Sequence, residues 1–264
     1  MAGEAEMEAV VNLPVDVAEI ATKTALCRSK IPGVEYVINP YIGCAHGCRY
    51  CYAQFMSKWS RHHAGAPWGS FVEVKVNMAD VLARELRSKR KRSRASISSV
   101  CDPYQPLEAR YGLTRKCLVH LAEYGWGIDI LTRSPLVIRD LDILAKSADV
   151  TVGFSIPTDD EKVRKILEPR APSIPSRLEA LKRLHHEGVR TWVFIAPILP
   201  MNPERLAEAI HPHVDYVLMD RLNYRKNVTQ LFHRNGWSSA LTDEYGAETE
   251  SRLLYLLQDK ARNV

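Results

Sequence analysis

Three cysteines lie close together in the first fifth of the chain, and they are the side chains best suited to chemistry. Cys44, Cys48 and Cys51 follow the spacing C-x3-C-x2-C, and Tyr50 stands directly before the third. In a reducing compartment, thiols spaced this closely bind metals or act in catalysis more often than they form disulfides. Three thiolates are one ligand fewer than a closed metal site normally uses. The motif therefore predicts a metal centre whose set of protein ligands is incomplete.

Two kinds of metal centre compete for these thiols. A structural zinc ion needs a fourth ligand, which His46, His62 or His63 could supply, but zinc motifs normally contain two separated ligand pairs. A [4Fe–4S] cluster could instead leave one iron open to an outside ligand. The amino and carboxylate groups of S-adenosylmethionine suit that position, and the two cofactors together support radical chemistry. Because no second ligand pair follows, the sequence favours the iron–sulfur cluster.

The composition is that of a globular protein outside the membrane. The chain has 264 residues, 46% of them hydrophobic, and a net charge of +5. Its longest apolar run, residues 191–201, is too short to span a bilayer and contains proline. The acidic N-terminus lacks the features of a secretory signal, so we expect a cytoplasmic protein. A basic run at 87–94 is either a solvated surface segment or a phosphate contact.

Short segments rich in β-branched and aromatic residues alternate with helical patterns along most of the chain. Six such segments repeat as strand and helix, which implies right-handed crossovers and a mostly parallel sheet. They are residues 36–42, 95–100, 127–132, 149–156, 190–199 and 214–220. An additional strand is expected at 71–77. Six units do not close an eight-stranded barrel, so the residues predict an α/β fold, either a partial barrel or a doubly wound sheet.

Capping residues and apolar spacing predict the helices and the domain limits. Asn77 is expected to cap a helix, with Asp80 as its capping partner. A second helix should end at Gly125, and a third should have Pro175 in its first turn. The residues expected to face the core are Met78, Val81, Leu82, Leu86, Leu113, Cys117, Leu121, Leu178, Leu181 and Leu184. We predict an N-terminal arm with a short helix (1–33), a core (34–225) and a C-terminal helical extension (226–264).

Residues 25 to 225 resemble the radical SAM superfamily, and within it the spore photoproduct lyase-like branch, often labelled DNA-repair photolyase-related. The segments that carry the resemblance are "NPYIGCAHGCRYCYA" (39–53), "CDPYQPLE" (101–108), "ILTRSPLVIRDLDIL" (130–144), "GFSIPTDDEKVRKILEPRAPS" (153–173) and "APILPMN" (196–202). One segment follows nearly every predicted strand, where a barrel site collects its residues. The resemblance implies a partial (β/α)6 TIM-type barrel.

The resemblance also implies the cofactors and their contacts. Cys44, Cys48 and Cys51 match the ligands of a [4Fe–4S] cluster, and S-adenosylmethionine is the second cofactor. Of the two charged matches, Asp102 would accept hydrogen bonds from the methionine amino group and Arg133 would pair with its carboxylate. The other matching positions are Tyr50 beside the adenine, Ser155 at the ribose, Glu168 and Arg170 near the cofactor, and Ala196 and Ile198 packed on the adenine.

The activity implied by the resemblance is reductive cleavage of S-adenosylmethionine to a 5′-deoxyadenosyl radical, which removes hydrogen from a substrate. The substrate expected from the branch is a nucleic acid or nucleotide, and the reductant a flavodoxin or ferredoxin. A cysteine that returns hydrogen in spore photoproduct lyase matches Ser99 here. Cys101, expected on the same side of the strand, and Tyr104 are the candidate replacements. Two alternatives are a small-molecule or peptide substrate, and an iron–sulfur regulator without turnover.

Overall fold

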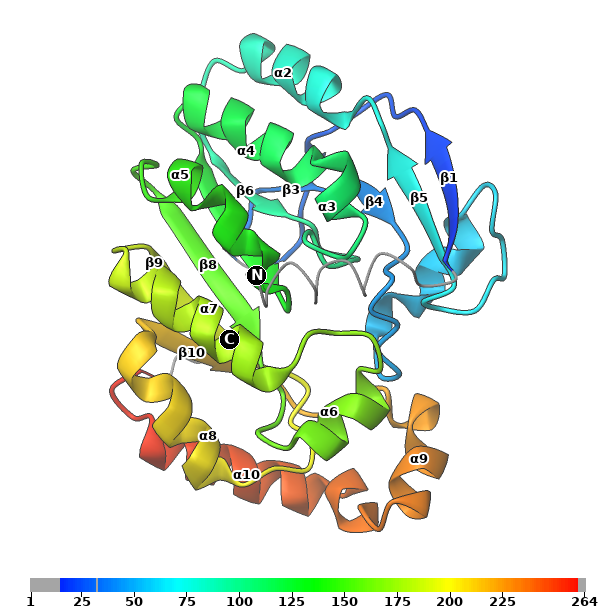
Figure 1. Cartoon of the computed structure of the whole chain (residues 1–264), viewed down its shortest axis with the longest axis vertical. Coiled ribbons are helices and arrows are strands. Elements are labelled where there is room, and N and C mark those ends of the chain that lie inside the picture. Colours follow the sequence, from blue (N-terminus) through cyan, green and yellow to red (C-terminus); the bar gives the residue numbers. More distant parts are fainter. Residues whose placement is uncertain (1–14, 32, 261–264) are drawn as a thin grey trace. The chain divides into compact units, whose positions relative to one another are not determined.

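The computed structural model describes residues 15–31 and 33–260, which form two compact units (Figure 1). The first unit comprises Met1–Gly47, Ala53–Thr132 and Arg139–Thr151. The second comprises Cys48–Tyr52, Arg133–Ile138 and Val152–Val264. Among the described residues, no helix is both long and apolar enough to cross a bilayer.

A mostly parallel seven-stranded sheet confirms the predicted α/β class. Its order is β10-β9-β8-β7-β6-β3-β2, so six strands follow one another in chain order and β2 lies at one edge. The strands are β2 (Cys27–Arg28), β3 (Tyr36–Ile38), β6 (Arg94–Ile97), β7 (Gly127–Thr132), β8 (Val150–Ser155), β9 (Arg190–Ile195) and β10 (Tyr216–Met219). Parallel registers pair Tyr36 with Ala95, and Tyr216 with Trp192. The sheet is that of a partial barrel and is not closed.

The first predicted strand is wrong in one respect, because residues 36–42 form two strands in different sheets. β3 ends at Ile38, and β4 (Tyr41–Ile42) pairs antiparallel with β5 (Phe71–Lys75). Pro40 stands between them and has no N–H to donate to a ladder. β1 (Asp16–Ile20) completes this second sheet parallel to β5. The short helix expected near the N-terminus is not found in residues 15–31, and residues 1–14 lie outside the described part.

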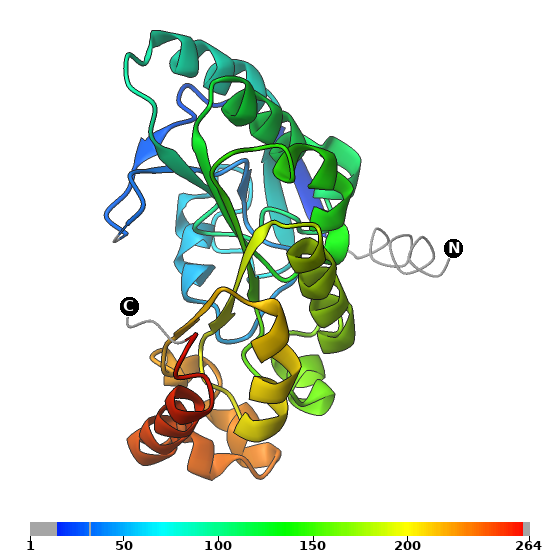
Figure 2. The same ribbon diagram turned by 90° about the vertical axis from the view of Figure 1, so that its left-hand side faces the viewer.

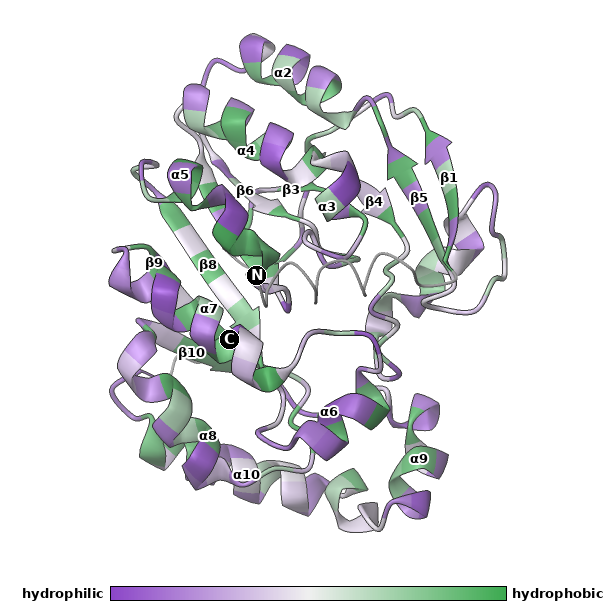
Figure 3. Ribbon diagram, in the orientation of Figure 1, coloured by the Kyte–Doolittle hydropathy of each residue, from purple (hydrophilic) through white to green (hydrophobic). Residues whose placement is uncertain are grey.

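Helices α2 (Met78–Ser88) and α4 (Leu113–Glu123) lie side by side in the first unit (Figures 1 and 2). Hydrophobic and hydrophilic residues both occur along α2 (Figure 3), and its four predicted core residues are buried. The predicted cap is wrong. The Asn77 side chain accepts from the Thr22 backbone N–H at 2.8 Å and donates to the Thr22 carbonyl at 3.0 Å, so it caps nothing on α2. Short helices α3 (Glu108–Tyr111) and α5 (Leu141–Leu144) complete this group.

Among its described residues, the second unit contains most of β8, all of β9 and β10, and five α-helices. Its helices are α6 (Glu161–Leu167), α7 (Ile174–His186), α8 (Pro203–Ile210), α9 (Thr229–Arg234) and α10 (Asp243–Leu256), with 3-10 turns η3 (His211–His213), η4 (Arg225–Asn227) and η5 (Ser238–Leu241). Ser173 caps α7 by accepting from the Ser176 N–H, and Pro175 lies in the first turn as predicted. Leu178, predicted to face the core, is only half-buried, because Arg177 occupies the fully buried position beside it.

Candidate functional site

The three clustered cysteines lie on one stretch of chain that begins just after β4. Cys44 belongs to the first unit, and Cys48 and Cys51 belong to the second. Cys44 and Cys48 are buried, and Cys51 is half-buried. Burial raises the pKa of the Cys48 thiol to about 12. A thiolate at that position therefore requires compensating positive charge, which a metal centre supplies when it binds.

In the first unit, Gln105 holds the backbone on both sides of Cys44. Its Oε1 accepts from the Ala45 N–H at 2.9 Å, and its Nε2 donates to the Gly43 carbonyl at 3.2 Å. The Gln105 side chain is fully buried. A doubly bonded buried amide fixes a backbone segment far better than one hydrogen bond would. The "CDPYQPLE" segment therefore positions the start of the cysteine motif.

Gly43 allows the sharp approach of this segment to β5, and its replacement by alanine is expected to be costly. Gly43 has φ +87°, and an added Cβ would lie 2.4 Å from the Phe71 carbonyl oxygen. We expect Gly43→Ala to lower the free energy of unfolding by about 2–4 kcal/mol, from left-handed strain plus overpacking. Gly65→Ala is the control, because Gly65 has φ +79° with open space around it. In urea unfolding, the clash should appear as a larger loss of unfolding free energy for Gly43→Ala than for Gly65→Ala. Equal losses for the two variants would contradict the clash.

Asp102 is held in one orientation by its own loop and by β7. Its Oδ1 accepts from the Tyr104 backbone N–H at 2.9 Å and from the Thr132 hydroxyl at 2.6 Å. Its Oδ2 lies 3.5 Å from His46 Nδ1. Asp102 and His46 are both buried. This places a fixed carboxylate at the carboxyl ends of β6 and β7, where an α/β site is expected.

Ser99 and Cys101 lie beyond the end of β6, so the expectation that they share one side of a strand is wrong. β6 ends at Ile97, and Ser98 adopts φ 67°, which breaks the alternation of an extended strand. The Cys101 thiol instead lies 2.8 Å from the Ser98 hydroxyl and 3.7 Å from the Tyr41 carbonyl oxygen. The bend turns this thiol toward β4.

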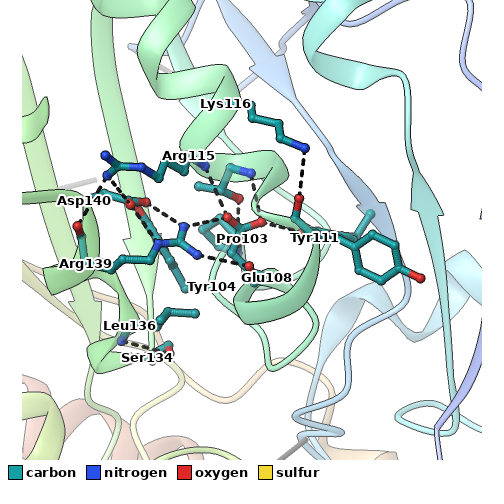
Figure 4. Close-up of polar contacts among 12 residues, drawn as sticks. Pro103, Tyr104, Glu108, Tyr111, Arg115, Lys116, Ser134, Leu136, Arg139 and Asp140 are labelled. Atoms are coloured by element: carbon teal, nitrogen blue, oxygen red, sulfur yellow. Dashed lines mark hydrogen bonds and ion pairs between the residues drawn. The ribbon is translucent and has the colours of Figure 1, made fainter. Parts of the chain in front are cut away.

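Tyr104 belongs to a buried polar network in the first unit (Figure 4). Its hydroxyl donates to Asp140 Oδ2 at 3.0 Å, and burial followed by the Asp140 charge raises its pKa well above the usual value. Arg139 bonds Asp140 at 2.8 Å and Glu108 Oε1 at 2.7 Å, and the Tyr41 hydroxyl donates to Glu108 Oε2 at 2.5 Å. Arg115 also bonds Asp140. The Tyr104 hydroxyl thus has a structural partner, and its role as a radical relay stays a prediction.

In the second unit, Glu168 joins two arginines and a tyrosine in one buried cluster. Its Oε1 accepts from Arg133 Nε at 2.8 Å and from the Tyr50 hydroxyl, and its Oε2 accepts from Arg177 Nη2 at 2.5 Å. Burial alone would raise the pKa of this carboxyl, but the Arg177 and Arg133 charges lower it to about 2. Glu168 is therefore ionised, and two guanidinium groups against one carboxylate leave a net positive charge.

Arg133 is the partly exposed member of this cluster, and the Tyr50 side chain beside it is buried. Burial lowers the pKa of Arg133, but its interactions with the Tyr50, Cys48 and Glu168 side chains outweigh burial and raise it well above the usual value. Arg133 Nη2 lies 3.1 Å from the Tyr50 hydroxyl, and its guanidinium lies 5.9 Å from the centre of the tyrosine ring. The side chain of Arg133 is 19% exposed, whereas that of Arg177 is fully buried. A permanent cation thus stands beside the residue that precedes Cys51.

Of the remaining predicted contact residues, Ser155 is bonded to this buried cluster, and the others are characterised by their burial and backbone contacts. Ser155, at the end of β8, offers its carbonyl oxygen to Arg177 Nη1 at 2.9 Å. Arg170 is half-buried in the turn after α6. Ala196 and Ile198 are buried after β9, and the Ile198 N–H donates to the Asp220 carbonyl at 2.9 Å. The structure thus brings Tyr50, Arg133, Glu168 and Ser155 together through Arg177.

No role was predicted from the sequence for Gln105 or Arg177. Gln105 nevertheless holds the backbone around Cys44, and Arg177 holds Glu168. Gln105 lies inside the "CDPYQPLE" segment, which was a usable signal. Arg177 lies at an apolar-facing position of α7, where helical periodicity predicts leucine. The facing carboxylate of Glu168 and the carbonyl oxygens of Ser155 and Pro172 compensate the buried arginine there.

Comparison with known proteins agrees with this arrangement. Residues 38–211 match the radical SAM superfamily. An uncharacterized protein of Methanocaldococcus jannaschii is 36% identical over 216 residues, covering 81% of this chain and 80% of that protein. An uncharacterized protein of Mycobacterium tuberculosis is 33% identical over 191 residues, covering 69% of this chain. The chain spans only 56% of that second relative.

Among solved structures, spore photoproduct lyase with bound AdoMet and dinucleoside spore photoproduct has the same fold. The TM-score is 0.69 with 17% sequence identity, over 98% of this chain and 84% of that chain. Identity this low establishes the fold alone. The superfamily uses a [4Fe–4S] cluster and S-adenosylmethionine and needs a reducing partner. With the family matched over residues 38–211, the chain belongs to the radical SAM superfamily.

Proposed function

We propose that this chain is a radical SAM enzyme that binds a [4Fe–4S] cluster through Cys44, Cys48 and Cys51 and cleaves S-adenosylmethionine reductively. When bound, the two cofactors supply a 5′-deoxyadenosyl radical able to abstract hydrogen from a substrate. The observation that carries the proposal is the set of three closely spaced cysteines on one short segment inside the family match. Gln105, which bonds the backbone on both sides of Cys44, supports it further.

The chain's own residues suit the charges of the second cofactor. The Asp102 carboxylate, already oriented by Tyr104 and Thr132, can accept hydrogen bonds from an ammonium group. Arg133 carries a permanent positive charge and a planar fork that suits a carboxylate. We assign Tyr50, Ser155, Glu168, Arg170, Ala196 and Ile198 to the same binding function. Glu168 acts there by holding Arg133 and Tyr50 in place through its Oε1.

A reconstitution assay tests this function. The chain is loaded anaerobically with iron and sulfide, reduced with dithionite and incubated with S-adenosylmethionine. We expect 5′-deoxyadenosine and methionine by mass spectrometry, formed in equal amounts because one C–S bond breaks per turnover. A chain that holds the cluster but releases no 5′-deoxyadenosine would overturn the enzymatic proposal and favour an iron–sulfur regulator.

The proposed substrate is a nucleic acid or nucleotide, acted on in the manner of spore photoproduct lyase. A small molecule or peptide is the second candidate, because Ser99 stands where the branch has its hydrogen-donating cysteine. Cys101, whose thiol contacts Ser98, is the proposed replacement donor, with Tyr104 as the other candidate. Irradiated DNA, nucleotides and peptides are each supplied in deuterated form. The one that transfers deuterium into 5′-deoxyadenosine identifies the substrate class. Transfer from peptide alone would reject the nucleic-acid substrate.

A further inference from the structure

An exposed aromatic and basic surface begins immediately after the last cysteine of the motif. Helix η1 (Tyr52–Trp59) starts one residue after Cys51. Phe55 is 46% exposed and Trp59 is 71% exposed, and Lys58 and Arg61 are also exposed. We call Phe55, Lys58, Trp59 and Arg61 the η1 surface. Large exposed aromatics beside cations are typical of interface residues.

The helix type places two of these side chains, Phe55 and Lys58, on the same side. A 3-10 helix has three residues per turn, so side chains three apart lie on the same side. Phe55 and Lys58 have this spacing, and Arg61 follows three residues after Lys58, just beyond the helix end. Trp59 adjoins Lys58. Phe55 and Lys58 therefore share one side of η1, and the exposed Trp59 and Arg61 follow them in the chain, all four within the first unit.

The η1 surface lies in a part of the chain that has no carboxylates. Residues 36–72 contain neither aspartate nor glutamate, whereas 31 acidic residues in 264 predict about four in 37 positions. Within the described residues, Lys58 and Arg61 make no ion pair. Glu73 is fully buried and bonded to Ser60, and the exposed Asp16 pairs with His63 at 3.1 Å. The two surface cations are therefore available to an acidic partner.

We propose that the η1 surface docks an acidic one-electron carrier protein, which reduces the cluster. The inference rests on the proposed function, since only a cluster bound by Cys51 needs an electron there. In each encounter the carrier is oxidised by one electron and the cluster is reduced by one, and no atom is transferred. Phe55 and Trp59 follow Cys51 by four and eight residues in the chain. The surface thus follows the last proposed cluster ligand directly in the sequence.

The chemistry of the surface suits a protein carrier better than a nucleic acid. Redox encounters use small, transient interfaces, steered by opposite charge and centred on a few apolar side chains. Nucleic acids are instead held by many phosphate contacts. The densest basic run, 87–94, ends at the first residue of β6 and so lies at the opposite end of that strand from Cys101. The η1 surface has only two fixed cations among its four residues.

Direct binding is the first test. Reduced and oxidised flavodoxin serve as the probe, with affinity measured by biolayer interferometry at low and high salt. We expect the double variant Lys58→Glu, Arg61→Glu to weaken binding by about tenfold or more at low salt, and salt to weaken binding of the parent protein. The matched control is Arg90→Glu, Lys91→Glu, the same charge change at exposed positions of the first unit. Equal binding by both variants would overturn the proposal.

The second test separates docking from catalysis. The rate of 5′-deoxyadenosine formation is measured with flavodoxin as donor and, separately, with dithionite, which needs no docking surface. We expect Phe55→Ala, Trp59→Ala to slow the flavodoxin reaction by about tenfold and to leave the dithionite reaction within about twofold. Tyr255→Ala, at an exposed tyrosine of α10, is the aromatic control. Equal slowing with both donors would overturn the docking role.

The outcomes remain distinguishable if the proposed function fails. No product with dithionite rejects the enzymatic activity, while the binding measurements still judge the docking surface. A single-stranded oligonucleotide is included in the binding assay. If the η1 variants lose the oligonucleotide but keep flavodoxin, the surface belongs to a nucleic acid and the proposal is wrong. Circular dichroism of each variant verifies that the fold is intact.

Discussion

Replacement of Cys48 by alanine is expected to remove about 90% or more of the iron–sulfur absorbance near 400 nm, because the cluster then keeps only two of three protein ligands. Formation of 5′-deoxyadenosine should fall to background with it. Cys48 is buried, and its thiol pKa is raised to about 12 by burial, so this residue is a poor nucleophile without a bound metal. Iron and sulfide analysis after anaerobic reconstitution measures the effect directly.

Cys117→Ala is the matched control for that experiment. Cys117 is also a buried free cysteine, but it lies on α4 among the core residues of the first unit. We expect this variant to lose about 1–2 kcal/mol of stability from the cavity and to keep the cluster. Equal iron contents in the two variants would reject Cys48 as a ligand.

Replacement of Glu168 by glutamine is expected to destabilise the fold by about 3–5 kcal/mol, because the buried charge of Arg177 loses its partner. Glu168 and Arg177 are both fully buried and bonded at 2.5 Å. The same change removes the carboxylate that holds Arg133 and Tyr50. Urea unfolding of the metal-free chain measures the loss without involving the cofactors.

The pH dependence of the same variant gives an independent measurement. The pKa of Glu168 is lowered from 4.5 to about 2, so its ionised form stabilises the fold above pH 4.5. That contribution is lost as the pH falls from 4.5 towards 2, and Glu168→Gln should flatten this part of the acid profile. Glu204→Gln removes an exposed pair with Arg252 and should change nothing measurable. Equal effects of the two substitutions would contradict the buried network.

Strands and helices whose pattern depends on neighbouring residues could be predicted well. β7 occupies residues 127–132 as the β-branched run indicated, and Met78, Val81, Leu82 and Leu86 face the core of α2. The predictions failed where a contact with a residue distant in the sequence determines the local structure. Asn77 bonds Thr22 and so leaves the helix uncapped. Residues 36–42 divide between two sheets because β4 pairs with β5, which lies about thirty residues later in the chain.

The candidate site shows the same division between local and distant effects. The spacing of Cys44, Cys48 and Cys51 pointed to a metal centre because a chelating segment is contiguous in the chain. The partners of the charged residues could not be predicted. Tyr50 and Glu168 are 118 positions apart, and Glu168 meets Arg177 only because α6 and α7 turn both side chains to one buried point.

The sequence by itself determined the kind of cofactor chemistry and the order of the six repeated strands, because both follow from spacing within short segments. The tertiary structure decided which side chains support the site. It buried Arg177 and Gln105, turned Cys101 toward β4 through the bend at Ser98, and left Phe55 and Trp59 exposed beside the cysteine segment. Burial and pairing of polar groups depend on contacts between distant residues, and those contacts exist only once the chain has folded.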